Sequence, residues 1–142
     1  MPFDIFRVPD LADIVRVFVR LLVAGAFGAV IGAEREASGK AAGLRTHILV
    51  ALGAALFVLF PSESGMTSAD MSRVIQGVAT GIGFLGAGTI LKRKDGEQVH
   101  GLTTAASIWV TAAVGLAVGA GELVLPLFIV TLAWIVLRVL PH

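Results

Sequence analysis

Five apolar stretches occupy most of this chain, and each is close to the length that crosses a lipid bilayer. A transmembrane helix needs about 20 mostly apolar residues, with about 17 as the lower limit. The stretches cover residues 14–33, 44–60, 74–91, 102–120 and 123–140. Hydrophobic residues make up 56% of the chain and charged residues only 15%, whereas soluble domains carry roughly 25% charged residues. The sequence therefore predicts an all-α, polytopic bundle of about five transmembrane helices. We expect one integral membrane domain over residues 1–142, without a soluble domain.

Several kinds of chemistry are disfavoured by what the sequence lacks. The chain has no cysteine, which excludes disulfides, thiolate metal sites and cysteine nucleophiles. It has no HExxH motif, no serine grouped with histidine and aspartate, and no pair of carboxylates inside an apolar stretch. The net charge of +1 gives no reason to expect nucleic-acid binding. We therefore expect a protein that is not an enzyme, needs no cofactor and has the lipid bilayer as its main surroundings.

Ionisable and hydroxyl side chains gather where the first apolar stretch ends and where the second and fourth begin. A charge at such a position needs a specific partner or a water-filled cavity. We take these side chains as a candidate functional polar cluster. Its members are Glu34, Arg35, Glu36, Arg45, Thr46, His47, Thr103 and Thr104.

Glu34 and Glu36 are the carboxylates that could offer oxygen ligands to a divalent cation. Two residues apart on a helix, their side chains point about 200° away from each other, so ion pairs with nearby basic residues are favoured over a metal site. We expect Arg45 to form a bidentate ion pair with one of them, because a carboxylate is the best partner for a guanidinium. His47 can relay protons or act as a hydrogen-bonded residue at the membrane interface, and the sequence leaves both possibilities open.

Glycines recur at helical spacing in several of the apolar stretches. Faces of small residues let transmembrane helices approach closely where no hydrophobic effect drives them together. Packing is the favoured explanation, and local unwinding of the third stretch to open a polar site is the alternative. The density of such faces predicts a homo-oligomer, with a dimer favoured. The helix-packing glycines are Gly28, Gly32, Gly77, Gly81, Gly88, Gly115 and Gly119.

The first four stretches have the pattern of a duplicated helical hairpin. Gly28 and Gly43 are separated by 15 positions, and so are Gly86 and Gly101. Two copies with the same orientation would form a parallel repeat about an axis along the membrane normal. The same spacing can also arise because small residues recur in any tightly packed bundle, and both explanations stay open. The fifth stretch has no counterpart.

Basic residues in short loops favour the cytoplasmic side of a membrane. They lie in the first loop and its flanks (Arg35, Lys40, Arg45), between the third and fourth stretches (Lys92, Arg93, Lys94) and near the C-terminus (Arg138). With five spans, this places the N-terminus outside and the C-terminus in the cytoplasm. Basic residues near the N-terminus favour the opposite orientation; they are Arg7, Arg16 and Arg20.

Four motifs, in this order, resemble the membrane domain of the MgtC/SapB family over roughly residues 21–121. They are Gly28-x-x-x-Gly32-x-Glu34-Arg35-Glu36, Ala42-Gly43-Leu44-Arg45-Thr46-His47, Gly81-Ile82-Gly83-Phe84-Leu85-Gly86-Ala87-Gly88 and Gly101-Leu102-Thr103-Thr104-Ala105-Ala106-x-x-Trp109. The resemblance implies a bacterial inner-membrane protein. It further implies a link to growth at low Mg²⁺ and to survival inside macrophages, and restraint of the F-type ATP synthase as one mode of action. Because the sequence stops at His142, we expect a short form that consists of the membrane domain alone.

Two functions follow from the residues and the resemblance together. The first is a non-enzymatic protein that regulates a membrane complex, or adaptation to low Mg²⁺, through helix–helix contacts. The alternative is an ion or small-solute transporter or channel subunit, for Mg²⁺ or protons, that uses Glu34, Glu36, Arg45 and His47.

Overall fold

The computed structural model describes residues 6–92 and 99–141, and within them the fold is all-α, as predicted. Its helices are α1 (Leu11–Ala37), α2 (Leu44–Glu63), α3 (Ser68–Ala87), α4 (Leu102–Gly119) and α5 (Val124–Val139). A short antiparallel pair of strands, β1 (Leu91–Lys92) and β2 (Val99–His100), connects α3 to α4 and was not predicted.

Three helices, α1, α2 and α4, are both long enough and apolar enough to cross a membrane. Helix α5 is apolar but shorter, at 16 residues. Helix α3 is not among the candidate spans, and it carries Asp70 and Arg73 in its first two turns. The chain is thus a multi-pass membrane protein, and crossing by α3 and α5 stays a prediction.

Helix α3 is displaced towards the N-terminus relative to the predicted stretch 74–91. The Thr67 side chain accepts a hydrogen bond from the Asp70 backbone N–H (3.2 Å) and so caps the helix. Because of this cap, the helix begins at Ser68, in a polar segment where the sequence has no apolar run. The helix ends at Ala87 because the chain turns there, with the Thr89 N–H bonded to the Gly86 carbonyl oxygen (2.9 Å).

The second predicted stretch ends at residue 60, but α2 continues past it and contains Pro61. Proline donates no backbone hydrogen bond, and its ring crowds the carbonyl four residues earlier. The Ser64 N–H still bonds to the Phe60 carbonyl oxygen (3.1 Å), so the helix continues to Glu63. Gly65, with φ of 73°, then turns the chain towards α3.

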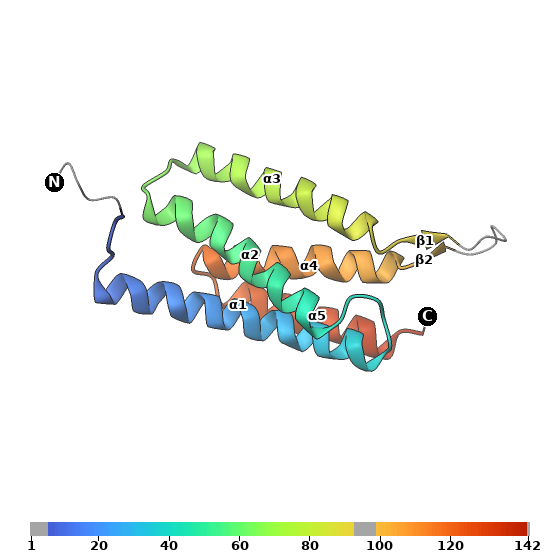
Figure 1. Ribbon diagram of the computed structural model, residues 1–142. Helices are drawn as coiled ribbons and strands as arrows, with labels where there is room; N and C mark the ends of the chain where they lie inside the picture. The colour runs from blue at the N-terminus through green and yellow to red at the C-terminus, as the bar shows by residue number, and fades with distance from the viewer. Residues whose placement is uncertain (1–5, 93–98, 142) are drawn as a thin grey trace.

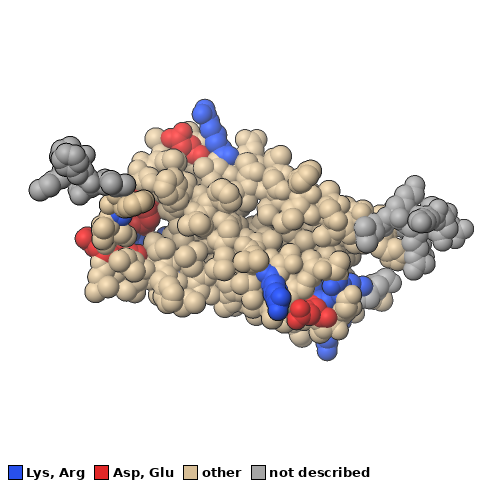
Figure 2. All heavy atoms as spheres, viewed as in Figure 1, with Lys and Arg blue, Asp and Glu red and all other residues tan. Residues whose placement is uncertain are grey.

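The five helices run along one common direction, as Figure 1 shows. Helices α1, α2 and α4 pack against one another, α5 packs on α1 and α4, and α3 packs on α2 and α4. Most of the face drawn in Figure 2 is uncharged, and its few Lys, Arg, Asp and Glu side chains lie at the left end, on the upper edge and at the lower right. A largely uncharged surface of this kind fits a bundle that lies in a membrane.

Three connections lie at one end of the bundle, which we call the hairpin end: residues 38–43, residues 88–92 with 99–101, and the segment after α5 (Figure 1). Gly39, with φ of 69°, ends α1 there. The Lys40 N–H bonds to the Arg35 carbonyl oxygen and the Gly39 N–H to that of Glu36, each at 3.0 Å. This glycine-dependent C-cap places the end of α1 next to the start of α2.

Candidate functional site

His47 is fully buried (0% exposed) in the first turn of α2 and connects that helix to α4. Its Nδ1 lies 2.8 Å from the Gly43 carbonyl oxygen and its Nε2 lies 3.0 Å from the Ser107 Oγ. The Ser107 Oγ also lies 2.7 Å from the Thr104 carbonyl oxygen. These contacts form a polar chain, His47–Ser107–Thr104, inside the hairpin end.

The polar chain has two possible arrangements of its hydrogens. A carbonyl oxygen only accepts, so His47 Nδ1 carries a hydrogen and donates it to Gly43. The single hydroxyl hydrogen of Ser107 can point to His47 Nε2, and the imidazole is then neutral. If that hydrogen points to the Thr104 carbonyl oxygen instead, Nε2 of the neutral ring receives no hydrogen from Ser107. The two arrangements differ in which of the two acceptors the Ser107 hydroxyl satisfies.

Arg35 is the most deeply buried charge among the described residues, at 0% exposed, and the adjacent Glu34 is only 5% exposed. Arg35 Nη1 lies 3.4 Å from Glu34 Oε2, which brings the charges together without a hydrogen bond. Glu34 Oε1 accepts a hydrogen bond from Ser38 Oγ (2.7 Å). All three guanidinium nitrogens and Glu34 Oε2 have no hydrogen-bond partner within the described part of the chain.

The other predicted cluster residues are less buried. Glu36 is exposed, on a different side of α1 from Glu34, in agreement with their two-residue separation. Thr46 is half-buried and Thr103 exposed. Among residues 6–92 and 99–141, no group of three or more His, Asp and Glu side chains could hold a metal ion.

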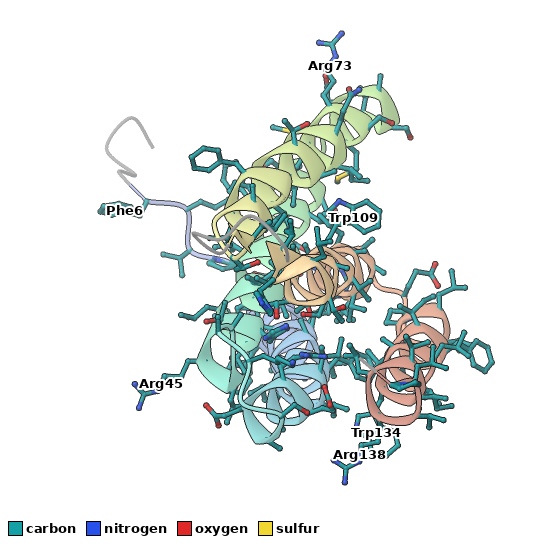
Figure 3. The ribbon with its side chains drawn as sticks, turned by 90° about the vertical axis from the view of Figure 1, so that its right-hand side faces the viewer. Phe6, Arg45, Arg73, Trp109, Trp134 and Arg138 are labelled. Atoms are coloured by element: carbon teal, nitrogen blue, oxygen red, sulfur yellow. The ribbon has the colours of Figure 1, made fainter. Side chains whose placement is uncertain are left out.

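The predicted ion pair of Arg45 is wrong. Arg45 is exposed and points away from the bundle (Figure 3), and it forms no ion pair with Glu34 or Glu36, both of which the structure describes. The reason is the face of α2 on which it lies: His47, two residues on, faces the core, so Arg45 faces outwards. Arg35 is the arginine that the fold buries.

Four of the predicted glycines pack inside the core. A Cβ at Gly28 would lie 2.6 Å from the His47 carbonyl oxygen, and one at Gly32 would lie 2.9 Å from His47 Cβ. Gly115 and Gly119 of α4 lie against the backbone of Ala51 and Ala55 in α2. These glycines bring α1, α2 and α4 together around the polar chain.

The predicted glycines of α3 differ from those of the core. A Cβ at Gly77 or Gly81 would meet no atom within 4 Å, and both residues line an apolar groove of about 600 Å³ between α2 and α3. Gly53 of α2 lines the same groove and is equally open. Gly88 is the C-cap of α3 and lies outside the helix.

Sequence reasoning missed Ser107 and Thr111, which are buried at 5% and 0% exposed. Thr111 Oγ donates to the Ser107 carbonyl oxygen (2.8 Å). The spacing of these residues could have identified them in the sequence. Thr104, Ser107 and Thr111 recur at intervals of three and four residues and so share one face of α4.

Comparison with known proteins decides the family. The sequence pattern of the MgtC family matches residues 21–142. The chain belongs to the MgtC family. The resemblance seen in its motifs is thereby confirmed.

Several curated relatives are similar over most of this chain. Protein SrpB of Synechococcus elongatus is 50% identical over 113 residues, which cover 72% of this chain and 62% of SrpB. Protein MgtC of Brucella abortus is 52% identical over 103 residues, covering 70% of this chain and 41% of that protein. YhiD of Escherichia coli K12, whose given name proposes that it transports magnesium, is 43% identical over 129 residues, covering 85% of this chain and 59% of YhiD. The chain thus matches about 40 to 60% of the length of these relatives. No solved structure matches it significantly.

Proposed function

We propose that this chain is a non-enzymatic protein of the bacterial inner membrane that supports adaptation to low Mg²⁺ through helix–helix contacts. Its partner is a second copy of the chain or another membrane complex, for which the family resemblance offers the F-type ATP synthase. The observation that carries the proposal is the apolar groove between α2 and α3, with its open glycines Gly53, Gly77 and Gly81.

These open glycines have no packing role within the single chain. Glycine inside a helix is about 1 kcal/mol less favourable than alanine, and a Cβ would fit at each of the three positions. Gly77 and Gly81 are four residues apart, so they form one smooth patch on α3. A smooth groove at membrane depth lets another helix approach closely, which is how helices associate where burial from water contributes little.

Leucine substitutions at Gly77 and Gly81 test the proposal. Both side chains would enter the groove, and no atom lies within 4 Å of either added Cβ, so we expect a folded protein that loses association in detergent, measured by light scattering. We also expect it to lose the ability to restore growth at low Mg²⁺ in a strain that lacks the chain.

Gly83→Leu is the matched control. Gly83 lies on the same helix and is equally open, but does not line the groove, so this variant should associate and function normally. A Gly77→Leu, Gly81→Leu protein that associates and supports growth like the original would exclude the groove as the contact.

Effects on the F-type ATP synthase are measured separately, as ATP hydrolysis in inverted membrane vesicles with and without the chain.

The second candidate function is permeation of protons or Mg²⁺, and the His47–Ser107–Thr104 chain favours it. A buried imidazole within hydrogen-bond distance of a hydroxyl is an arrangement that proton relays use, and the name of YhiD proposes magnesium transport for that relative. In reconstituted liposomes, His47→Ala or Glu34→Ala should abolish the flux, whereas Glu36→Ala, at an exposed position, should leave it intact. Flux equal to that of empty vesicles would exclude this function.

We also propose the orientation with the N-terminus outside and the C-terminus in the cytoplasm. Support comes from the hairpin end, where Lys40, Arg45 and Arg138 lie on connections or helix ends that meet at one side of the bundle. Arg93 and Lys94, whose positive charge also favours a cytoplasmic position for this end, lie outside the described residues.

A further inference from the structure

Arg35 has hydrogen-bonding capacity that the described residues do not use. Its side chain is fully buried, and its Nε, Nη1 and Nη2 have no hydrogen-bond partner among the described residues. A guanidinium carries five N–H donors. A nearby carboxylate at 3.4 Å balances the charge of Arg35 but accepts none of these hydrogens. Buried donors without acceptors are costly, so the geometry calls for an acceptor beyond the described residues.

A cavity of about 240 Å³ adjoins Arg35 at the hairpin end, between α1, α4 and α5. Thr103 lines it from α4, and Val136, Leu137, Leu140 and Pro141 line it from α5 and the segment that follows. The cavity therefore has a cationic side and a mainly apolar side. An oxyanion placed against Arg35 would accept its N–H groups in the planar arrangement that phosphate and carboxylate both match.

A second cavity, of about 280 Å³, adjoins the first and is almost entirely apolar. The two share Thr103, Val136 and Leu137. From these residues the second cavity extends between α4 and α5 towards Val110 and Ile129. A cationic cavity near the membrane surface thus adjoins an apolar one that runs towards the middle of the bilayer.

We propose that these two cavities form a binding site for one phospholipid, with its phosphate on the guanidinium of Arg35 and an acyl chain between α4 and α5. A free phosphate ion satisfies the first cavity only, whereas a phospholipid fills both. Phospholipids are also abundant in the membrane that surrounds the bundle. Basic side chains at the same end, the half-buried Lys40 and the exposed Arg45, add attraction for an anionic headgroup such as that of phosphatidylglycerol.

Native mass spectrometry of the protein, delipidated in maltoside detergent, tests the site. Phosphatidylglycerol, diacylglycerol and inorganic phosphate are added in separate samples, and bound ligand is counted per chain. We expect one retained phosphatidylglycerol per chain and weaker retention of the other two, because each fills only one cavity. Arg35→Gln should lower retention of phosphatidylglycerol by about tenfold, the effect of losing a charge-assisted hydrogen bond.

Ala106→Phe keeps the test decisive if Arg35→Gln does not fold. Ala106 lines the apolar cavity and is exposed on α4, so phenylalanine there should block the acyl chain while leaving Arg35 in place. Ala113→Phe is the matched control, because Ala113 is exposed on the same helix and lines neither cavity. Equal retention in the Ala106→Phe and Ala113→Phe proteins overturns the proposal. So does inorganic phosphate that binds as tightly as phosphatidylglycerol, which would mean a site for free oxyanions only.

Discussion

Gly28 of α1 lies so close to His47 of α2 that a Cβ at position 28 would be 2.6 Å from the His47 carbonyl oxygen. Any side chain at this position must push the two helices apart where they hold the buried imidazole. Gly28→Ala should therefore lower the free energy of unfolding by about 1–3 kcal/mol, as overpacking does. Unfolding in mixed micelles, followed by circular dichroism, measures this change.

The control for Gly28→Ala is Gly77→Ala on α3, where an added Cβ meets no atom within 4 Å. There the methyl group relieves the low helix propensity of glycine, so stability should rise by about 0.5–1 kcal/mol. Equal effects of the two substitutions would contradict the close approach of α1 and α2.

Ser107→Ala removes the side-chain partner of His47 Nε2 and leaves that nitrogen buried without a hydrogen bond. Such a loss costs about 1–3 kcal/mol, so we expect a measurable fall in thermal stability. Ser72→Ala is the control, because the exposed Ser72 hydroxyl bonds only to a backbone carbonyl oxygen of its own helix. A Ser107→Ala protein as stable as the Ser72→Ala protein would show that the polar chain contributes nothing to folding.

Arg35→Ala and Arg45→Ala should differ strongly in their effect on stability. Removing Arg35 leaves Glu34 buried without its charge partner, which costs about 3–5 kcal/mol. Arg45 is exposed and pairs with neither glutamate, so its removal should cost less than about 0.5 kcal/mol. The yield of folded protein and chemical unfolding in micelles measure both.

A double variant, Glu34→Gln with Arg35→Met, separates the charge effect from packing. It removes both charges at similar volume, and buried ion pairs replaced in this way often lose little stability. It should therefore be more stable than Arg35→Ala alone. A double variant as unstable as the single one would mean that Arg35 acts through its shape and not through its charge.

Single cysteines can report the orientation, since the chain has none of its own. Ala41 is exposed at the hairpin end, and Met66 is exposed in the connection from α2 to α3 at the opposite end. In intact spheroplasts, a membrane-impermeant maleimide should label Met66→Cys and leave Ala41→Cys unlabelled until the membrane is opened. The reverse pattern would place the N-terminus in the cytoplasm.

Helix positions could be predicted from the sequence wherever apolar runs have clear limits. The fourth and fifth stretches agree with α4 and α5 to within one residue at each end, because Gly101 and the Gly121–Glu122 turn interrupt the apolar pattern. The start of α3 was misplaced because its first turn is polar and is stabilised by the Thr67 cap. The short strands β1 and β2 could not be expected, because two residues each are too few to show a strand period.

The candidate site was only partly predictable. The sequence alone determined that charges would lie at the junction of α1 and α2, since apolar runs end there with Glu34, Arg35 and Arg45. Which of these charges would be buried was decided by tertiary packing. Gly28 and Gly32 pack closely against α2, and Arg35, three residues after Gly32 on α1, is fully buried in the assembled bundle. The sequence shows where charges lie along a helix. Whether such a charge is buried depends on how neighbouring helices are rotated against each other. That rotation is fixed only when the small-residue faces of several helices fit together.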